Sequence, residues 1–338
     1  MDHEVMISSV DENNVLSGEE KKISLPIKTA NTIVQTYLDS ISSDDLYEAE
    51  AALKDIELLV QRVINQSTKS GDANDWHNFA VDIARKDLYD LACDLLECGL
   101  SIYPKNIDLL ADYLQYGTSC GRIEKCKSFY KTLSKIPKIR WSWRGYSFSV
   151  SYLTYLWERS DSEKELEKLQ EEMIDLAETF RKNLPFEEES YRCEADVFKL
   201  LHKSKEEEDI LRLALNELKI APKCALRLAD LLFERGDYSE ALPLIQRGLR
   251  DAIQTQRTIN EGYLYYLMGL TKMALAQQAG APINEETACE IYADFDISLR
   301  QEHRAEYVNT MKAKTIVLVN KSGVSIPEKY EELNYLVQ

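Results

Sequence analysis

Two stretches of the chain carry hydrophobic residues or glycine at the same series of positions, at a shift of 34 residues. The small Ala92 of the first stretch corresponds to Cys126 of the second, and Trp76 corresponds to Leu110. Such a period fits a pair of antiparallel helices that repeats along the chain, because small residues let two helices approach closely. The aligned positions are Trp76, Phe79, Ala80, Ile83, Ala92, Leu96 and Gly99, followed by Leu110, Tyr113, Leu114, Gly117, Cys126, Tyr130 and Leu133.

This spacing and order resemble the tetratricopeptide repeat. The most specific match is the turn Gly236-Asp237-Tyr238-Ser239-Glu240-Ala241, which joins two predicted helices. The resemblance implies an all-α chain, a right-handed α-solenoid of helix-turn-helix repeats. We expect clear repeats over about 73–106, 107–138, 222–255 and 262–300, with divergent repeats over 139–221.

The ends of the chain differ from the repeats. Residues 1–25 are polar and acidic, which predicts a flexible tail. Residues 26–338 are expected to form a single helical-repeat domain, which opens with helices over about 28–41 and 45–66. Helices within 303–338 are expected to cap the last repeat, since a solenoid must cover its terminal apolar face.

Composition supports a helical, acidic protein. Only 12 of the 338 residues are glycine and 8 are proline, while the strand-like alternation of β-branched residues is nearly absent. The net charge of −17 disfavours general binding to nucleic acid or to an anionic membrane, because both need a basic surface.

No pattern for catalysis or metal binding stands out. The seven cysteines are scattered without a Cys-x-x-Cys pair, and the four histidines are far apart. Phosphate-binding loops and nucleophile elbows are not found either, so we expect no metal, no cofactor and no enzymatic activity. The N-terminus lacks the pattern of a signal peptide, and the unpaired cysteines fit a reducing compartment, so a cytoplasmic protein is predicted.

The resemblance also implies where a partner would bind. In tetratricopeptide repeats the first helix of each pair lines a concave groove. Aromatic and charged side chains at these positions could hold a peptide, although the aromatic residues could instead pack against the preceding repeat. The candidate partner-binding residues are Lys223, Arg227, Asp230, Phe233, Tyr263 and Tyr266.

A basic segment interrupts the acidic chain. The segment 122–144 contains eight basic residues and one acidic residue, Glu124, whereas the segment 158–217 is strongly acidic. The basic residues are either neutralised inside the molecule by this acidic region, or they bind an acidic protein; nucleic acid ranks last. This basic patch comprises Arg122, Lys125, Lys127, Lys131, Lys135, Lys138, Arg140 and Arg144.

The sequence therefore predicts a scaffold or adaptor that binds a peptide or protein partner through its groove. The alternative is a regulatory or sensing subunit that responds to a short peptide or assembles with an effector enzyme. An enzyme with an unrecognised site ranks third.

Overall fold

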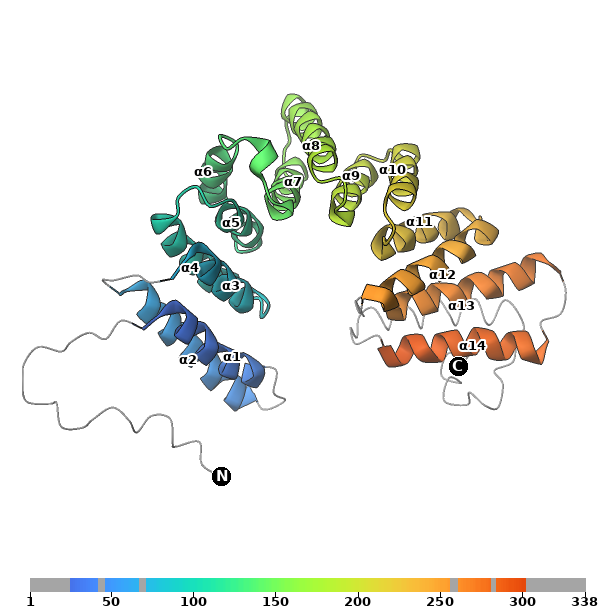
Figure 1. Ribbon diagram of the computed structural model, residues 1–338, viewed down its shortest axis with the longest axis horizontal. Helices are drawn as coiled ribbons and strands as arrows, with labels where there is room; N and C mark the ends of the chain where they lie inside the picture. The colour runs from blue at the N-terminus through green and yellow to red at the C-terminus, as the bar shows by residue number, and fades with distance from the viewer. Residues whose placement is uncertain (1–24, 42–45, 67–70, 256–260, 281–283, 302–338) are drawn as a thin grey trace, which may run out of the picture. The chain divides into compact units, whose positions relative to one another are not determined.

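The computed structural model describes residues 25–41, 46–66, 71–255, 261–280 and 284–301. Within these residues the chain is helical and contains no strand (Figure 1). The chain divides into two compact units, the first ending at Ile136 and the second beginning at Pro137. The predicted all-α fold is confirmed, whereas a single domain over 26–338 stays a prediction. The predicted cap over 303–338 and all but the last residue of the predicted tail lie outside the described residues.

The first unit is a stack of helix pairs. The two helices of each pair pack against each other, and the first helix of each pair also contacts the first helix of the next, which is the arrangement of a tetratricopeptide-like stack. The pairs are α1 (Ile27–Ile41) with α2 (Leu46–Ile64), α3 (Ala73–Ala84) with α4 (Tyr89–Ile102), and α5 (Ile107–Ser119) with α6 (Ile123–Leu133).

The second unit repeats this arrangement after a short 3-10 helix, η3 (Lys138–Arg140). The first helices of successive pairs contact each other, so α7, α9, α11 and α13 form one face, which we call the A-helix face. The pairs are α7 (Trp143–Trp157) with α8 (Glu163–Asn183), α9 (Glu188–Leu200) with α10 (Ser204–Glu217), α11 (Pro222–Arg235) with α12 (Tyr238–Thr255), and α13 (Glu261–Gln278) with α14 (Glu285–Gln301).

Small residues set the distance between paired helices. Ala92, Cys126 and Ala241 are all 0% exposed, as the repeat alignment predicts. Gly117 permits the closest approach, because a Cβ added there would lie 2.7 Å from the Cys126 sulfur. The small positions of the repeat therefore act through packing between helices.

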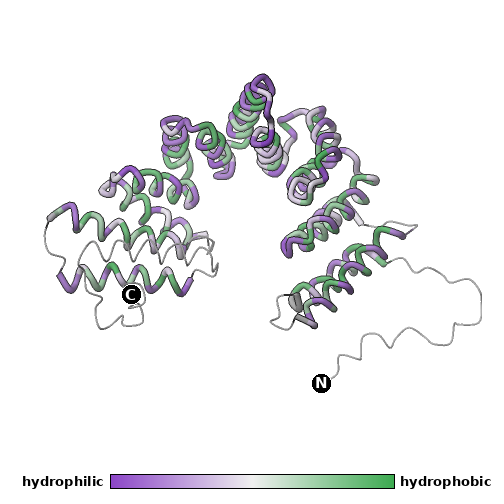
Figure 2. Tube along the Cα trace, turned by 180° about the vertical axis from the view of Figure 1, so that it is seen from behind, coloured by the Kyte–Doolittle hydropathy of each residue, from purple (hydrophilic) through white to green (hydrophobic). Residues whose placement is uncertain are grey.

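Some helices begin at capping residues, and most are amphipathic. Asp72 and Asp75 form a capping box at the start of α3, and the Asn106 side chain accepts a 3.0 Å hydrogen bond from the backbone N–H of Leu109. Hydrophobic and hydrophilic residues alternate along each helical trace (Figure 2). This alternation leaves one side of most helices for the core and another for solvent.

Candidate functional site

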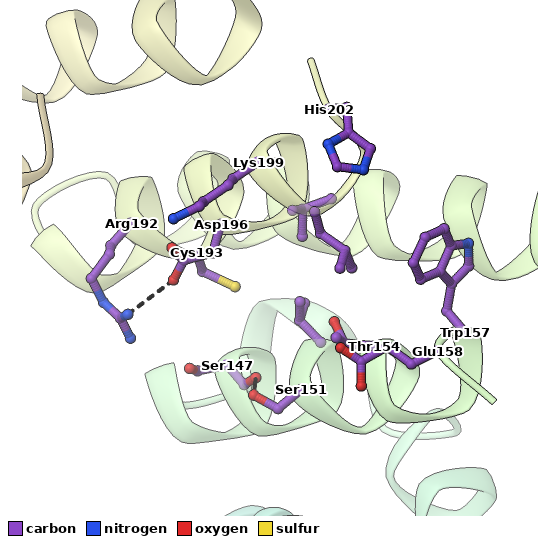
Figure 3. A pocket seen from close by; sticks show the side chains of 13 residues that line it. Ser147, Ser151, Thr154, Trp157, Glu158, Arg192, Cys193, Asp196, Lys199 and His202 are labelled. Atoms are coloured by element: carbon purple, nitrogen blue, oxygen red, sulfur yellow. Dashed lines mark hydrogen bonds and ion pairs between the residues drawn. The ribbon is translucent and has the colours of Figure 1, made fainter. Parts of the chain in front are cut away.

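A pocket of about 630 Å³ opens between α7 and α9 on the A-helix face of the second unit (Figure 3). One wall comes from α7, and the opposite wall comes from α9 and the turn that follows it. The lining residues are Ser147, Val150, Ser151, Thr154, Trp157 and Glu158 on α7, and Arg192, Cys193, Asp196, Val197, Lys199, Leu200 and His202 on the other side.

The pocket is elongated along the two helices. The rise of about 1.5 Å per helical residue gives the α7 wall a length of roughly 16 Å from Ser147 to Glu158. An extended chain advances about 3.3 Å per residue, so this length fits roughly five residues of an extended peptide. The volume also lies within the usual range of ligand pockets.

Packing beneath the pocket fixes the α7 wall. The Tyr146 ring stacks on Phe180 of α8 with centroids 4.9 Å apart, and its hydroxyl donates a 2.6 Å hydrogen bond to the backbone carbonyl of Lys138. The Thr154 hydroxyl contacts the Met173 sulfur at 3.4 Å. These contacts hold α7 against α8, so the side chains that line the pocket project from a supported helix.

An ion pair fixes the α9 wall from behind. Buried Glu194 on α9 accepts a 2.5 Å hydrogen bond from the Arg181 guanidinium on α8. The Tyr191 hydroxyl donates a 3.0 Å hydrogen bond to the backbone carbonyl of Pro185, at the turn between the two helices. Both walls of the pocket are therefore held by α8.

A charge network closes the end of the pocket formed by the beginnings of the two helices. Arg192 donates hydrogen bonds to Asp196 at 2.9 Å and to Glu189 at 3.1 Å. Burial raises the pKa of Asp196 above its usual value, although the charges of Arg192 and Arg227 lower it. Burial also raises the pKa of Glu189, but Arg192 and Lys223 outweigh it and hold that pKa below its usual value. The Arg192 charge is thus compensated within the protein.

The other lining cation is not compensated in this way. Lys199 is exposed and forms no ion pair with any residue that the structure describes. Glu158, the acidic residue on the opposite wall, lies 3.6 Å from Arg159. Lys199 is thus an exposed cation of the pocket without a direct ion pair, although its charge lowers the pKa of Asp196.

The charge network brings two predicted binding residues next to the pocket. Lys223 on α11 lies 3.6 Å from Glu189, and the Arg227 guanidinium lies 4.0 Å from Asp196 and 3.0 Å from Glu207. Glu207 is itself buried, at 5% exposed. Lys223 and Arg227 thus have acidic partners inside the protein and connect α11 to the pocket wall.

The remaining predicted binding residues pack within the last two helix pairs. Tyr266 is 3% exposed and belongs to the core formed with α14. The Tyr263 hydroxyl donates a 2.6 Å hydrogen bond to Asp230, and the Phe233 ring lies 5.1 Å from that of Tyr238. All six predicted binding residues thus lie on α11 and α13, but much of the surface of their aromatic rings packs against other side chains.

The basic patch is divided between the two units at Ile136. In the first unit Arg122 bonds to Asp94 at 2.7 Å and to Glu97 at 3.1 Å, and Lys125 bonds to Glu97 at 2.6 Å. These acids lie on α4, in the preceding repeat. In contrast, three lysines are exposed and form no ion pair with a described residue of their own unit: Lys127, Lys131 and Lys135.

The second unit carries the rest of the basic patch. Lys138 forms a 2.8 Å ion pair with Asp175 on the acidic helix α8. Arg140 is exposed, and the Arg144 guanidinium lies 4.6 Å from the centre of the Trp143 ring. Acidic residues of the molecule thus compensate part of this patch, and an aromatic ring covers another part.

The described part of the chain shows no group of three or more His, Cys, Asp and Glu side chains that could bind a metal ion. None of its helices is long and apolar enough to span a bilayer. The closest pair of thiols is formed by Cys93 and Cys120, whose sulfurs lie 3.8 Å apart.

The fold and the pocket define a helical-repeat protein with an open groove between the first helices of two successive pairs.

No protein-family model matches the chain, and no curated protein matches it. Solved structures with a similar arrangement include TTC0263, a TPR protein of Thermus thermophilus, at 19% identity and a TM-score of 0.45 over 60% of this chain and 98% of that one. A tetratricopeptide repeat protein from Parabacteroides merdae has 17% identity and a TM-score of 0.45, over 83% and 97% of the two chains. A human IFIT1 dimer with PPP-AAAA has 15% identity and a TM-score of 0.43, over 92% and 72%. These values indicate nothing about the partners of this chain.

Proposed function

We propose that this chain is a non-enzymatic scaffold that binds a segment of another protein on the A-helix face of its second unit. The observation that carries the proposal is the pocket between α7 and α9, which is long enough for several residues of extended peptide. Its walls are supported by α8, so the binding surface is formed before a partner arrives. Such preorganisation lowers the entropic cost of binding.

The network that joins Asp196 to Arg227 extends this surface toward α11. A partner that covers the pocket would therefore also meet the charged residues predicted from the sequence. Compensated charges at the rim of an interface contribute more to specificity than to affinity. We accordingly assign the affinity to the pocket and the choice of partner to the adjoining charges.

The proposal is tested by filling the pocket. Ser151 is exposed on the α7 wall, so Ser151→Arg places a long side chain in the groove without removing a core residue. The matched control is Ser239→Arg on α12, which is equally exposed and does not line the pocket. Affinity-tagged proteins are incubated with extract of the cells that produce this protein, and the captured proteins are identified by mass spectrometry.

We expect the wild type and Ser239→Arg to capture the same proteins, and Ser151→Arg to lose them while keeping the same melting temperature. Capture that survives Ser151→Arg would contradict binding in the pocket.

A further inference from the structure

A histidine occupies a glycine position at the edge of the pocket. His202 follows α9 with φ 56°, in the left-handed region. The equivalent turns after α5 and α11 contain Gly121 at φ 80° and Gly236 at φ 90°. All three turns close with the same backbone hydrogen bond. The residue that follows the one with positive φ donates its N–H to the carbonyl five residues before it, and the distance is 2.9 Å after α9, 2.7 Å after α5 and 2.9 Å after α11.

A side chain in this conformation is disfavoured, because its Cβ crowds the backbone. The only other non-glycine residue with positive φ in the described chain is Asp87, at φ 61°. Asp87 has a local compensation, since its carboxylate accepts a 2.6 Å hydrogen bond from the Tyr89 hydroxyl. Asp, Asn and His are also found in this conformation more often than other non-glycine residues.

His202 has no such compensation. Its side chain is exposed and forms no hydrogen bond or ion pair with another described residue. The imidazole lines the pocket, on the same side as Lys199 (Figure 3). Residues in this conformation cluster at functional sites, and the exposed imidazole at the pocket makes His202 a candidate ligand contact.

The pocket around His202 has a defined chemistry. Val150, Val197 and Leu200 give it apolar lining. The acidic side chains that line it already have basic neighbours, whereas Lys199 forms no direct ion pair with a described residue. Apolar surface beside an imidazole and an exposed cation that forms no direct ion pair complements an apolar side chain that is next to an acidic one.

We propose that the pocket between α7 and α9 binds an extended peptide segment in which an apolar side chain is flanked by acidic side chains. The apolar side chain lies against Val150 and Val197, and the carboxylates accept hydrogen bonds from Lys199 and His202. This inference rests on the proposed function and specifies the partner's chemistry at the same site.

The test uses the full chain and a positional-scanning library of hexapeptides that are fluorescein-labelled at the N-terminus and amidated at the C-terminus. Binding is measured by fluorescence anisotropy. We expect the enriched peptides to carry Asp or Glu next to an aliphatic or aromatic residue. A library without an enriched peptide, or enriched peptides without acidic residues, would overturn the inference. If the amidated library does not bind and the same peptides with free C-terminal carboxylates do, the assignment to side chains is overturned.

Two variants separate recognition from folding. Lys199→Gln and His202→Gly should each weaken binding of the enriched peptides by at least about tenfold, the loss expected for one charge-assisted hydrogen bond. His202→Gly should also raise the melting temperature, because glycine relieves the backbone. The matched control is Asp87→Gly. It replaces the other non-glycine residue with positive φ, which does not line the pocket, so peptide affinity should not change. Equal affinity of the wild type, Lys199→Gln and His202→Gly would refute the assignment.

The two proposals fail in different ways. Partner capture that is lost in Ser151→Arg but kept in Lys199→Gln and His202→Gly would leave the proposed function standing and remove this inference. Capture that persists in Ser151→Arg would remove the proposed function.

Discussion

At the scale of single residues, the two tyrosines of α13 separate packing from binding. Tyr266 is 3% exposed, whereas Tyr263 is half-buried and bonds to Asp230. Tyr266→Ala should therefore lower the free energy of unfolding by roughly 3–5 kcal/mol, as removal of a buried aromatic side chain does. Tyr263→Phe keeps the ring, removes only the hydroxyl and should lower it by about 1 kcal/mol. Chemical denaturation of both variants measures the difference, and a small loss for Tyr266→Ala would return this residue to the list of binding candidates.

The thiols offer a second residue-scale prediction. Burial raises the pKa of Cys193 and of Cys224 well above the usual range, and it raises the pKa of Cys126 to about 11. Since the thiolate is the reactive form, these cysteines should resist alkylation of the native protein at neutral pH. The partly exposed Cys120 and Cys289 should react first. Peptide mass spectrometry after brief treatment with iodoacetamide tests the order, and early labelling of Cys193 would contradict the burial.

At the scale of helices, the repeat spacing predicts most of the fold. Ala92 and Ala241 are predicted to be buried from the sequence alone, because each occupies the small position of a repeat, and both are. The pocket was not predicted. Its apolar residues Val150 and Val197 have the spacing of ordinary core positions, and its polar residues have the spacing of ordinary exposed positions. The sequence pattern does not show which exposed faces of α7 and α9 enclose a cavity, since that depends on the distance between the helices.

Overpacking tests the small positions. Ala92→Phe or Ala241→Phe should lower the free energy of unfolding by roughly 1–3 kcal/mol, because no space exists for the ring between the paired helices. Ala51→Phe on α2 is the matched control, since Ala51 is exposed and its substitution should change stability by about 0.5 kcal/mol or less. Thermal melting of the three variants measures the effect, and equal melting temperatures would mean that the repeat alignment is wrong.

One carboxylate joins three helices of the first unit. Glu97 on α4 accepts hydrogen bonds from the Tyr113 hydroxyl on α5 at 2.8 Å and from Lys125 on α6 at 2.6 Å. Burial raises the pKa of Glu97, but Lys125, Tyr113 and Arg122 outweigh it and hold that pKa below its usual value. A carboxyl whose folded pKa is depressed stabilises the protein above its unfolded pKa of about 4.3, and this contribution is lost as the pH falls through the folded value.

Glu97→Gln should therefore lower the free energy of unfolding by roughly 1–3 kcal/mol at neutral pH, and the difference from the wild type should shrink below about pH 4. Urea denaturation at both pH values tests this. A difference that does not change with pH would show that the charge of Glu97 is not what stabilises the three helices.

At the scale of the whole molecule, the question is what the basic residues do in a chain with a net charge of −17. Arg122, Lys125 and Lys138 have acidic partners, and these ion pairs are lost when the charge of the basic residue is reversed. An exposed lysine without an acidic partner contributes little to folding, so it remains free to attract an acidic protein. The two groups should therefore respond differently to charge reversal.

The triple variant Lys127→Glu, Lys131→Glu, Lys135→Glu should keep the melting temperature of the wild type at low ionic strength, because these side chains are exposed. The control Arg122→Glu should melt lower, since it places a carboxylate against Asp94 and Glu97. Part of its loss should return with salt, as the Debye length falls from about 10 Å at 0.1 M to about 3 Å at 1 M. A triple variant that melts as low as Arg122→Glu, and recovers with salt, would show that the three lysines are neutralised inside the molecule. If they instead attract an acidic protein partner, the triple variant should slow its association, and the effect should diminish with salt.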